Sequence, residues 1–372
     1  MKDKVIFVDN QQKLAKTIEQ LKKENEIAVD TEGNSLYSYY SKICLIQISV
    51  RKAHYIIDPI KIKEISALEQ VLSNQSIEKI IHAAAYDIQM LYQSANIQIK
   101  NLFDTQIAAN FLGEKNLGLA SLIKKYFGVD LNKFHQKSNW AIRPLPKEMI
   151  EYAISDTAYL LPLANILKKQ LKLKERIEWV KEECQLLTIN KTKEKTKKRT
   201  TINIGKIPTE RLHIFHAITE FRENLARQLD LPAFRIIDKD TILKIAKLER
   251  FDLKRLRQLT ARFPFVQKNF EQLLEAINSA GKYKFLKEKR QKILIKLPEK
   301  EKREKIEKLY QWRTKKAQQL EIEPHLVLSQ KQMVSLVEYS INTMDDILQS
   351  GCLKNWQKNL FGKELCEILK KP

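Results

Sequence analysis

The stretch EIAVDTE, residues 26–32, places two carboxylates at the end of a short apolar run. The apolar residues 27–29 favour a buried strand. Asp30 and Glu32 stand two positions apart, so their side chains point to the same side of an extended chain. Two like charges at the edge of a core are costly unless a cation neutralises them, and Mg²⁺ prefers oxygen ligands. The stretch predicts a strand with a divalent-metal site, although surface pairs of acidic residues are also common.

Strand-like and helix-like segments alternate around this stretch. Short apolar segments that resemble strands cover residues 26–30, 44–49, 54–58 and 79–83. Helical patterns cover roughly 11–24, 64–73, 84–95, 104–112, 117–127 and 147–170, followed by an amphipathic helix over 171–190. Such alternation is typical of an α/β layer built around a mixed sheet.

The sequence pattern predicts helices throughout the second half of the chain, and one segment of this half occurs twice in diverged form. Residues 191–199 contain six basic residues, one acidic residue and no apolar residue, which predicts an exposed linker or basic tether. Beyond it, FRENLARQLDL (221–231) matches WRTKKAQQLEI (312–322) at an offset of 91 residues. A Lys/Glu-rich helix is expected between them, over 282–308. We interpret the two matching segments as diverged copies of one helical module.

The charge is divided unevenly along the chain. The 372 residues carry 67 Lys or Arg and 45 Asp or Glu, a net charge of +22. Residues 1–190 hold 26 basic and 22 acidic residues, a net of +4, so residues 191–372 hold a net of +18. Solubility alone does not require this division. It favours a nearly neutral catalytic half joined to a half that grips a polyanion such as nucleic acid.

The sequence predicts a cytoplasmic protein that does not enter membranes. No apolar run approaches the roughly 18–20 residues of a membrane span, and the N-terminal apolar stretch soon meets Asp9. The four cysteines lack CxxC spacing and read as thiols in a reducing compartment.

Two further motifs carry carboxylates. HAAAYD, residues 82–87, runs from a strand into a helix, where Asp87 also has a simple interpretation as an acid favouring the positive helix end. In YAISD, Tyr152 and Asp156 lie one helical turn apart, at a spacing that is also found at the edge of a core. Each motif is a modest signal by itself.

In the order DxE, HxxxxD and YxxxD, the motifs resemble the DEDD exonuclease superfamily, in the variety whose last motif carries Tyr. The segments LYSYYSKICLIQIS, HYIIDPI, LFDTQIAANFLG, WAIRPLP and YAISDTAYLLPL resemble the ribonuclease D family of bacteria, from about Val5 to about Leu171. The two C-terminal repeats resemble the paired HRDC (helicase and ribonuclease D C-terminal) modules of that family.

The resemblance implies a ribonuclease H-like mixed-sheet exonuclease domain followed by two all-α HRDC-like domains. The expected boundaries are 1–190 for the exonuclease domain, 191–206 for the basic linker, 207–287 for the first HRDC domain and 288–372 for the second.

The resemblance also assigns the chemistry. It implies that two divalent cations, Mg²⁺ or Mn²⁺, are held by Asp30, Glu32, Asp87 and Asp156. It also implies that Tyr152 orients the attacking water. Two metals can activate a water and relieve charge on the leaving oxygen of a phosphodiester. The implied activity is 3′→5′ exoribonuclease release of nucleoside 5′-monophosphates, in 3′ processing of precursor transfer RNA, with no obligate protein partner.

Substrate contacts are expected from five further residues: Thr31, His82, Tyr37, Trp140 and Arg143. Tyr37 could stack on a base or pack against the sheet, Trp more often belongs to a core, and a lone His is more often structural.

Some other polar residues have structural interpretations and are not expected to take part in the chemistry. Asp104 is expected as a helix N-cap, and Asp58, which precedes a proline, as a turn residue. His213 and His216 lack Cys partners and do not predict a zinc site.

Two alternatives remain beside an RNA-directed enzyme. A DNA-directed 3′→5′ exonuclease of the repair type would carry the same carboxylates. A catalytically inactive nucleic-acid-binding protein could keep the fold, although the presence of all four carboxylates argues against it.

Overall fold

The computed structural model describes residues 4–193, 207–208, 211–248, 252–280, 299–339 and 341–370. Its N-terminal part contains a six-stranded sheet in the order β1-β4-β3-β2-β5-β6. The strands are β1 (Lys4–Val8), β2 (Glu26–Gly33), β3 (Ile43–Val50), β4 (Ala53–Ile57), β5 (Glu78–Ile81) and β6 (Leu102–Asp104). β3 runs antiparallel to β2 and β4, and the other pairs are parallel, which confirms the expected mixed sheet.

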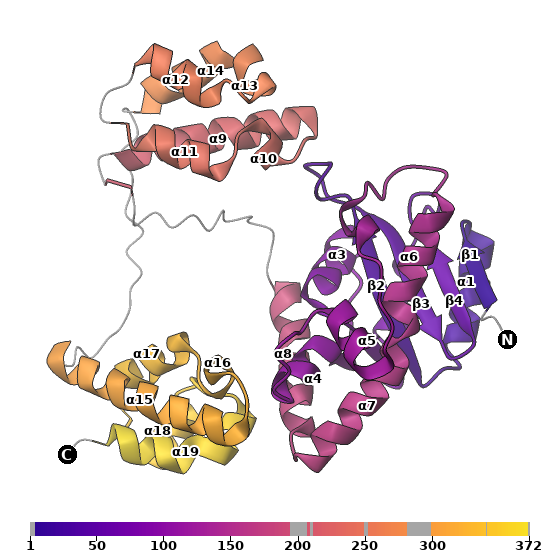
Figure 1. Ribbon diagram of the computed structural model, residues 1–372, viewed down its shortest axis with the longest axis vertical. Coiled ribbons are helices and arrows are strands. Elements are labelled where there is room, and N and C mark those ends of the chain that lie inside the picture. Colours follow the sequence, from indigo (N-terminus) through magenta and orange to yellow (C-terminus); the bar gives the residue numbers. More distant parts are fainter. Residues whose placement is uncertain are drawn as a thin grey trace.

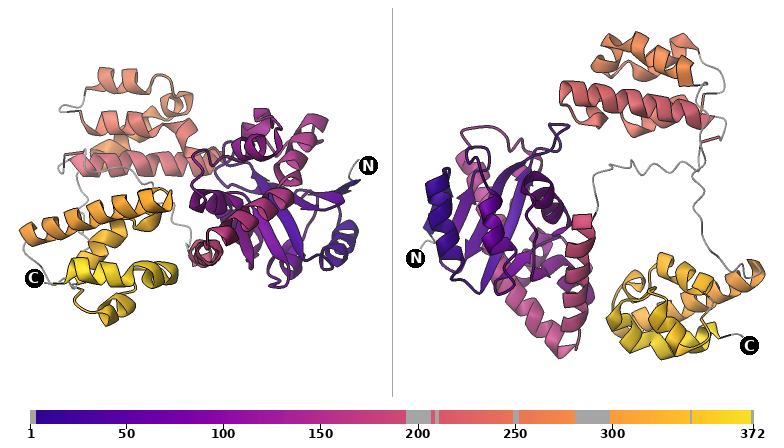
Figure 2. Two further views of the ribbon diagram at one scale, coloured as in Figure 1. Left: turned by 60° about the horizontal axis from the view of Figure 1, so that its bottom comes forward. Right: turned by 180° about the vertical axis from the view of Figure 1, so that it is seen from behind.

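Helices flank the sheet on both sides (Figure 1; Figure 2). They are α1 (Gln11–Leu21), η1 (Ser66–Leu68), α2 (Glu69–Leu72), α3 (Ala85–Ala95), α4 (Thr105–Phe111), α5 (Leu119–Phe127), η2 (Phe134–Lys137), α6 (Lys147–Ala158), α7 (Leu160–Leu173) and α8 (Ile177–Lys193). α6 packs on β2, β3 and β4, and α3 packs on β2 and β3. These two helices and β2 carry the candidate site.

The structure breaks two helices that the periodicity predicts as continuous. The expected helix 147–170 is divided at Tyr159 into α6 and α7, because Pro162 has no N–H to donate to the preceding turn. The expected helix 171–190 begins only at Ile177, because Glu175 adopts a left-handed conformation (φ 56°) that ends α7.

Two groups of helices follow, each built on one long helix (Figure 1). The first comprises α9 (Leu212–Leu229), α10 (Ala233–Ile236), α11 (Lys239–Ala246), α12 (Leu253–Thr260), α13 (Pro264–Lys268) and α14 (Phe270–Ser279). The second comprises α15 (Glu299–Leu320), α16 (Pro324–Val327), α17 (Gln330–Tyr339), α18 (Met344–Gln349) and α19 (Asn355–Leu369). α9 and α10 end 91 residues before α15 and α16 end, respectively, and α11 ends 93 residues before α17 ends. This spacing is in keeping with the repeat seen in the sequence.

Some expectations fall outside the described residues. The linker expected over 191–206 has its first three residues in α8, and 194–206 lie outside the described part. Of the helix expected over 282–308, the structure describes only the portion from Glu299 onward, in α15. No helix in the described ranges is long and apolar enough to span a membrane.

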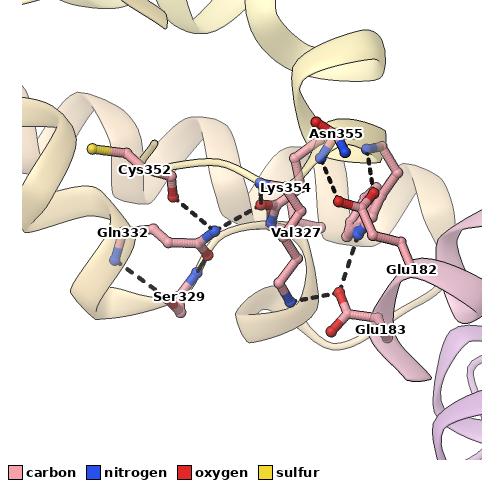
Figure 3. Close-up of polar contacts among 10 residues, drawn as sticks. Glu182, Glu183, Val327, Ser329, Gln332, Cys352, Lys354 and Asn355 are labelled. Atoms are coloured by element: carbon pink, nitrogen blue, oxygen red, sulfur yellow. Dashed lines mark hydrogen bonds and ion pairs between the residues drawn. The ribbon is translucent and has the colours of Figure 1, made fainter. Parts of the chain in front are cut away.

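The second helical group is docked on α8 by charged contacts at the start of α19 (Figure 3). The Glu182 carboxylate accepts hydrogen bonds from the backbone N–H groups of Asn355 (2.7 Å) and Trp356 (2.9 Å). The neighbouring Glu183 forms an ion pair with Lys354 and accepts a hydrogen bond from the indole of Trp356 (3.0 Å). A carboxylate at a helix N-terminus is stabilised by the unpaired N–H groups and the positive end of the helix dipole.

Aromatic and backbone contacts extend the same interface. The indole of Trp356 stacks on that of Trp179 in α8, with 4.8 Å between ring centroids. Arg176 donates hydrogen bonds to the carbonyls of Phe111 (2.8 Å) and Leu320 (2.6 Å), so one guanidinium bridges the two parts of the chain.

The first helical group contacts the loop that follows β2. Asp230, at the end of α9, accepts hydrogen bonds from the Ser38 hydroxyl (2.8 Å) and the Tyr40 backbone N–H (3.0 Å). The Tyr39 hydroxyl donates to Glu223 (3.2 Å). Both helical groups therefore contact the α/β part through specific polar groups.

Candidate active site

Three of the four predicted carboxylates meet on one face of the sheet. Asp30 and Glu32 alternate with Thr31 along β2, and Asp156 comes from α6, which packs on that face. One carboxylate oxygen from each of the three lies within 4.8 Å of the others. The spacing of Asp30 and Glu32 in the sequence already placed these two side chains on one side of the strand. Asp156 joins them because α6 packs against β2.

Asp87 approaches from the first turn of α3 and is only 4% exposed. Its carboxylate accepts a 2.6 Å hydrogen bond from the Thr31 hydroxyl. Thr31 points away from the face of Asp30 and Glu32 because neighbours along a strand alternate. Thr31 therefore orients Asp87, and it also lines the cavity beside Asp30 and Glu32, so its contact with substrate stays a prediction.

The carboxylates repel one another in a partly buried setting. Burial, together with the charges of Asp156 and Asp87, raises the pKa of Glu32 to about 9. Burial and the same neighbours hold the pKa of Asp30 well above its usual range. Burial raises the pKa of Asp156 to about 6 and that of Asp87 to about 7. Such a set of oxygen donors fits a divalent cation, which would relieve the repulsion.

Tyr152 lies one turn before Asp156 on α6, and both side chains line the same cavity. Burial and the charge of Asp156 raise the pKa of the Tyr152 phenol above its usual value. The phenol therefore keeps its proton at neutral pH. The rings of His135 and Trp140 each lie 6.0 Å from the Tyr152 ring and hold its orientation.

A cavity of about 390 Å³ opens over these groups. Its lining includes Asp30, Glu32, Tyr152 and Asp156, together with His82. The size falls within the usual range for a small-ligand pocket, roughly 300–1,000 Å³.

His82 faces this cavity as a neutral imidazole. Its Nδ1 shares a 2.9 Å hydrogen bond with the Thr105 hydroxyl. Burial lowers the pKa of His82 below its usual value. The imidazole can therefore offer a hydrogen bond to a substrate without adding charge.

Trp140 and Arg143 serve the fold, in contrast to the substrate contacts expected for them. Trp140 is 1% exposed and packs in an apolar cluster behind Tyr152. The Arg143 guanidinium donates to both carboxylate oxygens of the fully buried Asp58, each at 2.7 Å, and to the Cys44 carbonyl at 2.7 Å. These bonds occupy the guanidinium, so it is not directed at the cavity. Sequence reasoning treated Asp58 as a turn residue and missed this pair.

Tyr37 lies outside the cavity lining. Its hydroxyl donates to the Lys137 carbonyl (2.7 Å), and the Arg235 guanidinium lies 5.2 Å from the centre of its ring. Its contact with substrate stays a prediction.

Several polar residues of the cavity were not identified from the sequence. Lys133, directly before η2, and Gln136, within η2, line the cavity with Asn132 and with Gln106 of α4. The segment between α5 and α6 is polar and irregular, so no periodicity marked the first three of these positions.

Asp104 was expected only as a helix cap, and it does cap α4 through the N–H groups of Gln106 and Ile107. Its carboxylate also accepts hydrogen bonds from the backbone of Ala83 (3.1 Å) and Ala84 (2.8 Å). Ala83 has a left-handed conformation (φ 58°), which is strained for a residue with a Cβ. Asp104 thereby fixes the turn that leads into α3 and Asp87.

Comparison with known families agrees with this geometry. Residues 5–172 match the 3′-5′ exonuclease family, and residues 211–277 and 303–369 each match the HRDC domain. The chain therefore carries a 3′-5′ exonuclease domain of that family, followed by two HRDC domains. An exonuclease domain of this kind implies a nucleic-acid substrate, and its acidic cluster implies dependence on a divalent metal.

Individual relatives narrow the resemblance to ribonuclease D, as the sequence motifs predicted. Ribonuclease D of Bartonella henselae is 30% identical over 246 residues, which cover 64% of this chain and 61% of that protein. The chain thus spans about three fifths of the length of the curated relative it matches.

Two solved structures are similar to this chain in fold. The catalytic core of RRP6 from Trypanosoma brucei is 28% identical, with a TM-score of 0.63 over 75% of this chain and 80% of that chain. Escherichia coli RNase D shares the fold over 99% of both chains, with a TM-score of 0.72 and 23% identity.

Proposed function

We propose that the protein is a 3′→5′ exoribonuclease that removes nucleotides from RNA 3′ ends as nucleoside 5′-monophosphates. The observation that carries the proposal is the meeting of Asp30, Glu32 and Asp156 oxygens within 4.8 Å, beside a cavity of nucleotide-binding size. The similarity to ribonuclease D and RRP6 favours RNA over DNA as the substrate.

Asp30, Glu32, Asp87 and Asp156 would hold two divalent cations, Mg²⁺ or Mn²⁺. When bound, the cations supply an activated water and relieve charge on the leaving 3′ oxygen. The protein supplies the negative charge that concentrates the cations and the buried walls that strengthen their electrostatic effect. Thr31 keeps the Asp87 carboxylate in place by its 2.6 Å hydrogen bond.

Tyr152 would orient the attacking water. Its phenol is protonated at neutral pH and lines the cavity beside Asp156, so it can donate to or accept from a water held there. His82 and Lys133 line the same cavity and could contact the sugar and phosphate of the terminal nucleotide.

The remaining parts of the proposal concern the cellular substrate. We place the domain boundaries at 1–190, 207–287 and 288–372, joined by a basic linker over 191–206. The net charge of +18 beyond residue 190 supports a role of these parts in holding RNA, because Lys and Arg neutralise phosphates. We further propose 3′-extended precursor transfer RNA as substrate, action in the cytoplasm, and no obligate protein partner.

A matched pair of strands tests the reaction. One labelled sequence, made as RNA and as DNA, is incubated with the protein and Mg²⁺ or Mn²⁺. We expect stepwise shortening of the RNA from its 3′ end. Faster removal of the DNA would favour the repair-type alternative, and no metal-dependent shortening of either strand would favour an inactive binding protein.

Variants connect the activity to the site. Asp30→Ala should abolish shortening while RNA binding is retained. Glu151→Ala is the matched control, because Glu151 lies on α6 next to Tyr152 with its side chain 63% exposed. Equal activity of Asp30→Ala and the wild type would remove the proposed metal site from the reaction.

A further inference from the structure

Gln47, in the middle of β3, is a buried polar residue without a partner. Its side chain is 0% exposed, and neither its amide nitrogen nor its amide oxygen has a hydrogen-bond partner among the described residues. Buried side-chain amides are almost always hydrogen-bonded, because leaving one unsatisfied costs free energy. The Gln47 amide therefore needs a hydrogen-bond partner that the described residues do not supply.

The register of the sheet places Gln47 directly opposite Asp30. In the antiparallel pair of β2 and β3, Asp30 pairs with Gln47, Glu32 with Leu45, and Ala28 with Ser49. Side chains of directly opposed residues leave the same face of a sheet, with Cβ atoms about 5 Å apart. Gln47 is therefore the cross-strand neighbour of Asp30.

The neighbours of Gln47 along β3 identify that face. Ser49 shares a 2.6 Å hydrogen bond with Thr157 of α6, and Leu45 belongs to an apolar cluster with Met149 and Ala153 of α6. Gln47 stands between these two residues, so it faces α6. This is also the side from which Asp156 reaches Asp30 and Glu32.

We propose that Gln47 is a positioning residue for Asp30. Its amide N–H donates to the Asp30 carboxylate when that carboxylate is turned toward a bound cation. A ligand that must serve a metal in one orientation needs a second contact to fix it, and hydrogen bonds to ligating carboxylates commonly supply that contact. This inference rests on the metal role of Asp30 proposed above, and it explains why a costly unpaired amide is placed here.

Metal binding in the absence of RNA tests the inference without measuring activity. The full chain is titrated with Mn²⁺ by calorimetry, as wild type, Gln47→Met and Gln47→Leu. We expect the Mn²⁺ Kd to rise about 10- to 100-fold in both variants. The thermal midpoint of the metal-free protein should not fall, because each variant replaces an unsatisfied amide with an apolar side chain.

Ser49→Ala is the matched control, because Ser49 lies on the same strand and face but opposite Ala28. It should keep the wild-type Kd for Mn²⁺. An unchanged Kd in Gln47→Met overturns the inference. Loss of folding of both metal-free apolar variants also overturns it, because the amide would then serve the fold.

The two proposals fail in different ways. If the wild type binds Mn²⁺ and Gln47→Met binds it more weakly, the positioning role is supported. If the same wild type leaves RNA intact, the proposed activity is overturned. A wild type that does not bind Mn²⁺ overturns both.

Discussion

Asp156→Asn should stabilise the metal-free protein, because the native state then no longer carries a charge that burial disfavours. Burial raises the pKa of Asp156 from 3.8 to about 6. Two pKa units correspond to about 3 kcal/mol at 1.36 kcal/mol per unit. Since the Asn amide must find hydrogen-bond partners of its own, we expect a net gain of about 2 kcal/mol at pH 8.

The stability gain of Asp156→Asn over the wild type should increase as the pH rises. Between pH 4 and pH 6, the native state binds a proton at Asp156 that the unfolded chain has released. The contribution of this group to wild-type stability therefore falls as the pH rises through that window. The advantage of Asp156→Asn should be about 2 kcal/mol at pH 8 and should become a loss of about 1 kcal/mol at pH 4, where only the cost of the Asn amide remains.

Urea unfolding in EDTA, followed by circular dichroism at pH 4, 6 and 8, measures this difference. Glu151→Gln, an exposed change on the same helix, should alter the free energy of unfolding by less than about 0.5 kcal/mol. A metal-free Asp156→Asn protein that is less stable than the wild type at pH 8 would refute the electrostatic reasoning. A gain of equal size at all three pH values would refute it as well.

Other expectations follow from single contacts. Tyr152→Phe should lower kcat by about 100-fold while Mn²⁺ affinity stays constant, which calorimetry and initial rates can compare. Arg143→Met should cost about 3 kcal/mol in urea unfolding, because it leaves the buried Asp58 carboxylate unpaired, with no change in the KM for RNA. Glu182→Ala should speed hydrogen exchange at the Trp356 amide by about tenfold, since that N–H loses its carboxylate partner. The affinity for RNA should fall about tenfold or more between roughly 50 and 200 mM salt.

The central strands were predictable because their burial shows in the sequence. β3 is buried at every position and appears as the apolar run around 44–49. β1 and β6 were missed for different reasons. β1 is a half-exposed strand at one edge of the sheet, and β6 has only three residues directly before a helix.

Part of the candidate site was predictable from local sequence spacing, and part was not. The spacing of Asp30 and Glu32 fixes their common face, and the helical turn between Tyr152 and Asp156 fixes theirs. That these two pairs meet depends on packing of α6 against β2, which no local pattern encodes. The Arg143–Asp58 pair depends equally on a contact between residues 85 positions apart.

The contacts of the helical groups lay beyond sequence reasoning for a related reason. Glu182 and Trp356 are 174 residues apart, and each reads as an ordinary helix residue in its own segment. Local periodicity predicts the helices but not the surfaces on which they dock.

The most direct test of the proposed activity is a time course on a 3′-extended precursor transfer RNA, labelled at its 5′ end, with and without divalent metal. We expect metal-dependent shortening from the 3′ end, release of nucleoside 5′-monophosphates, and no shortening by Asp30→Ala. Shortening that persists in EDTA or in Asp30→Ala would contradict the proposed activity, as would an RNA left intact by the metal-loaded wild type.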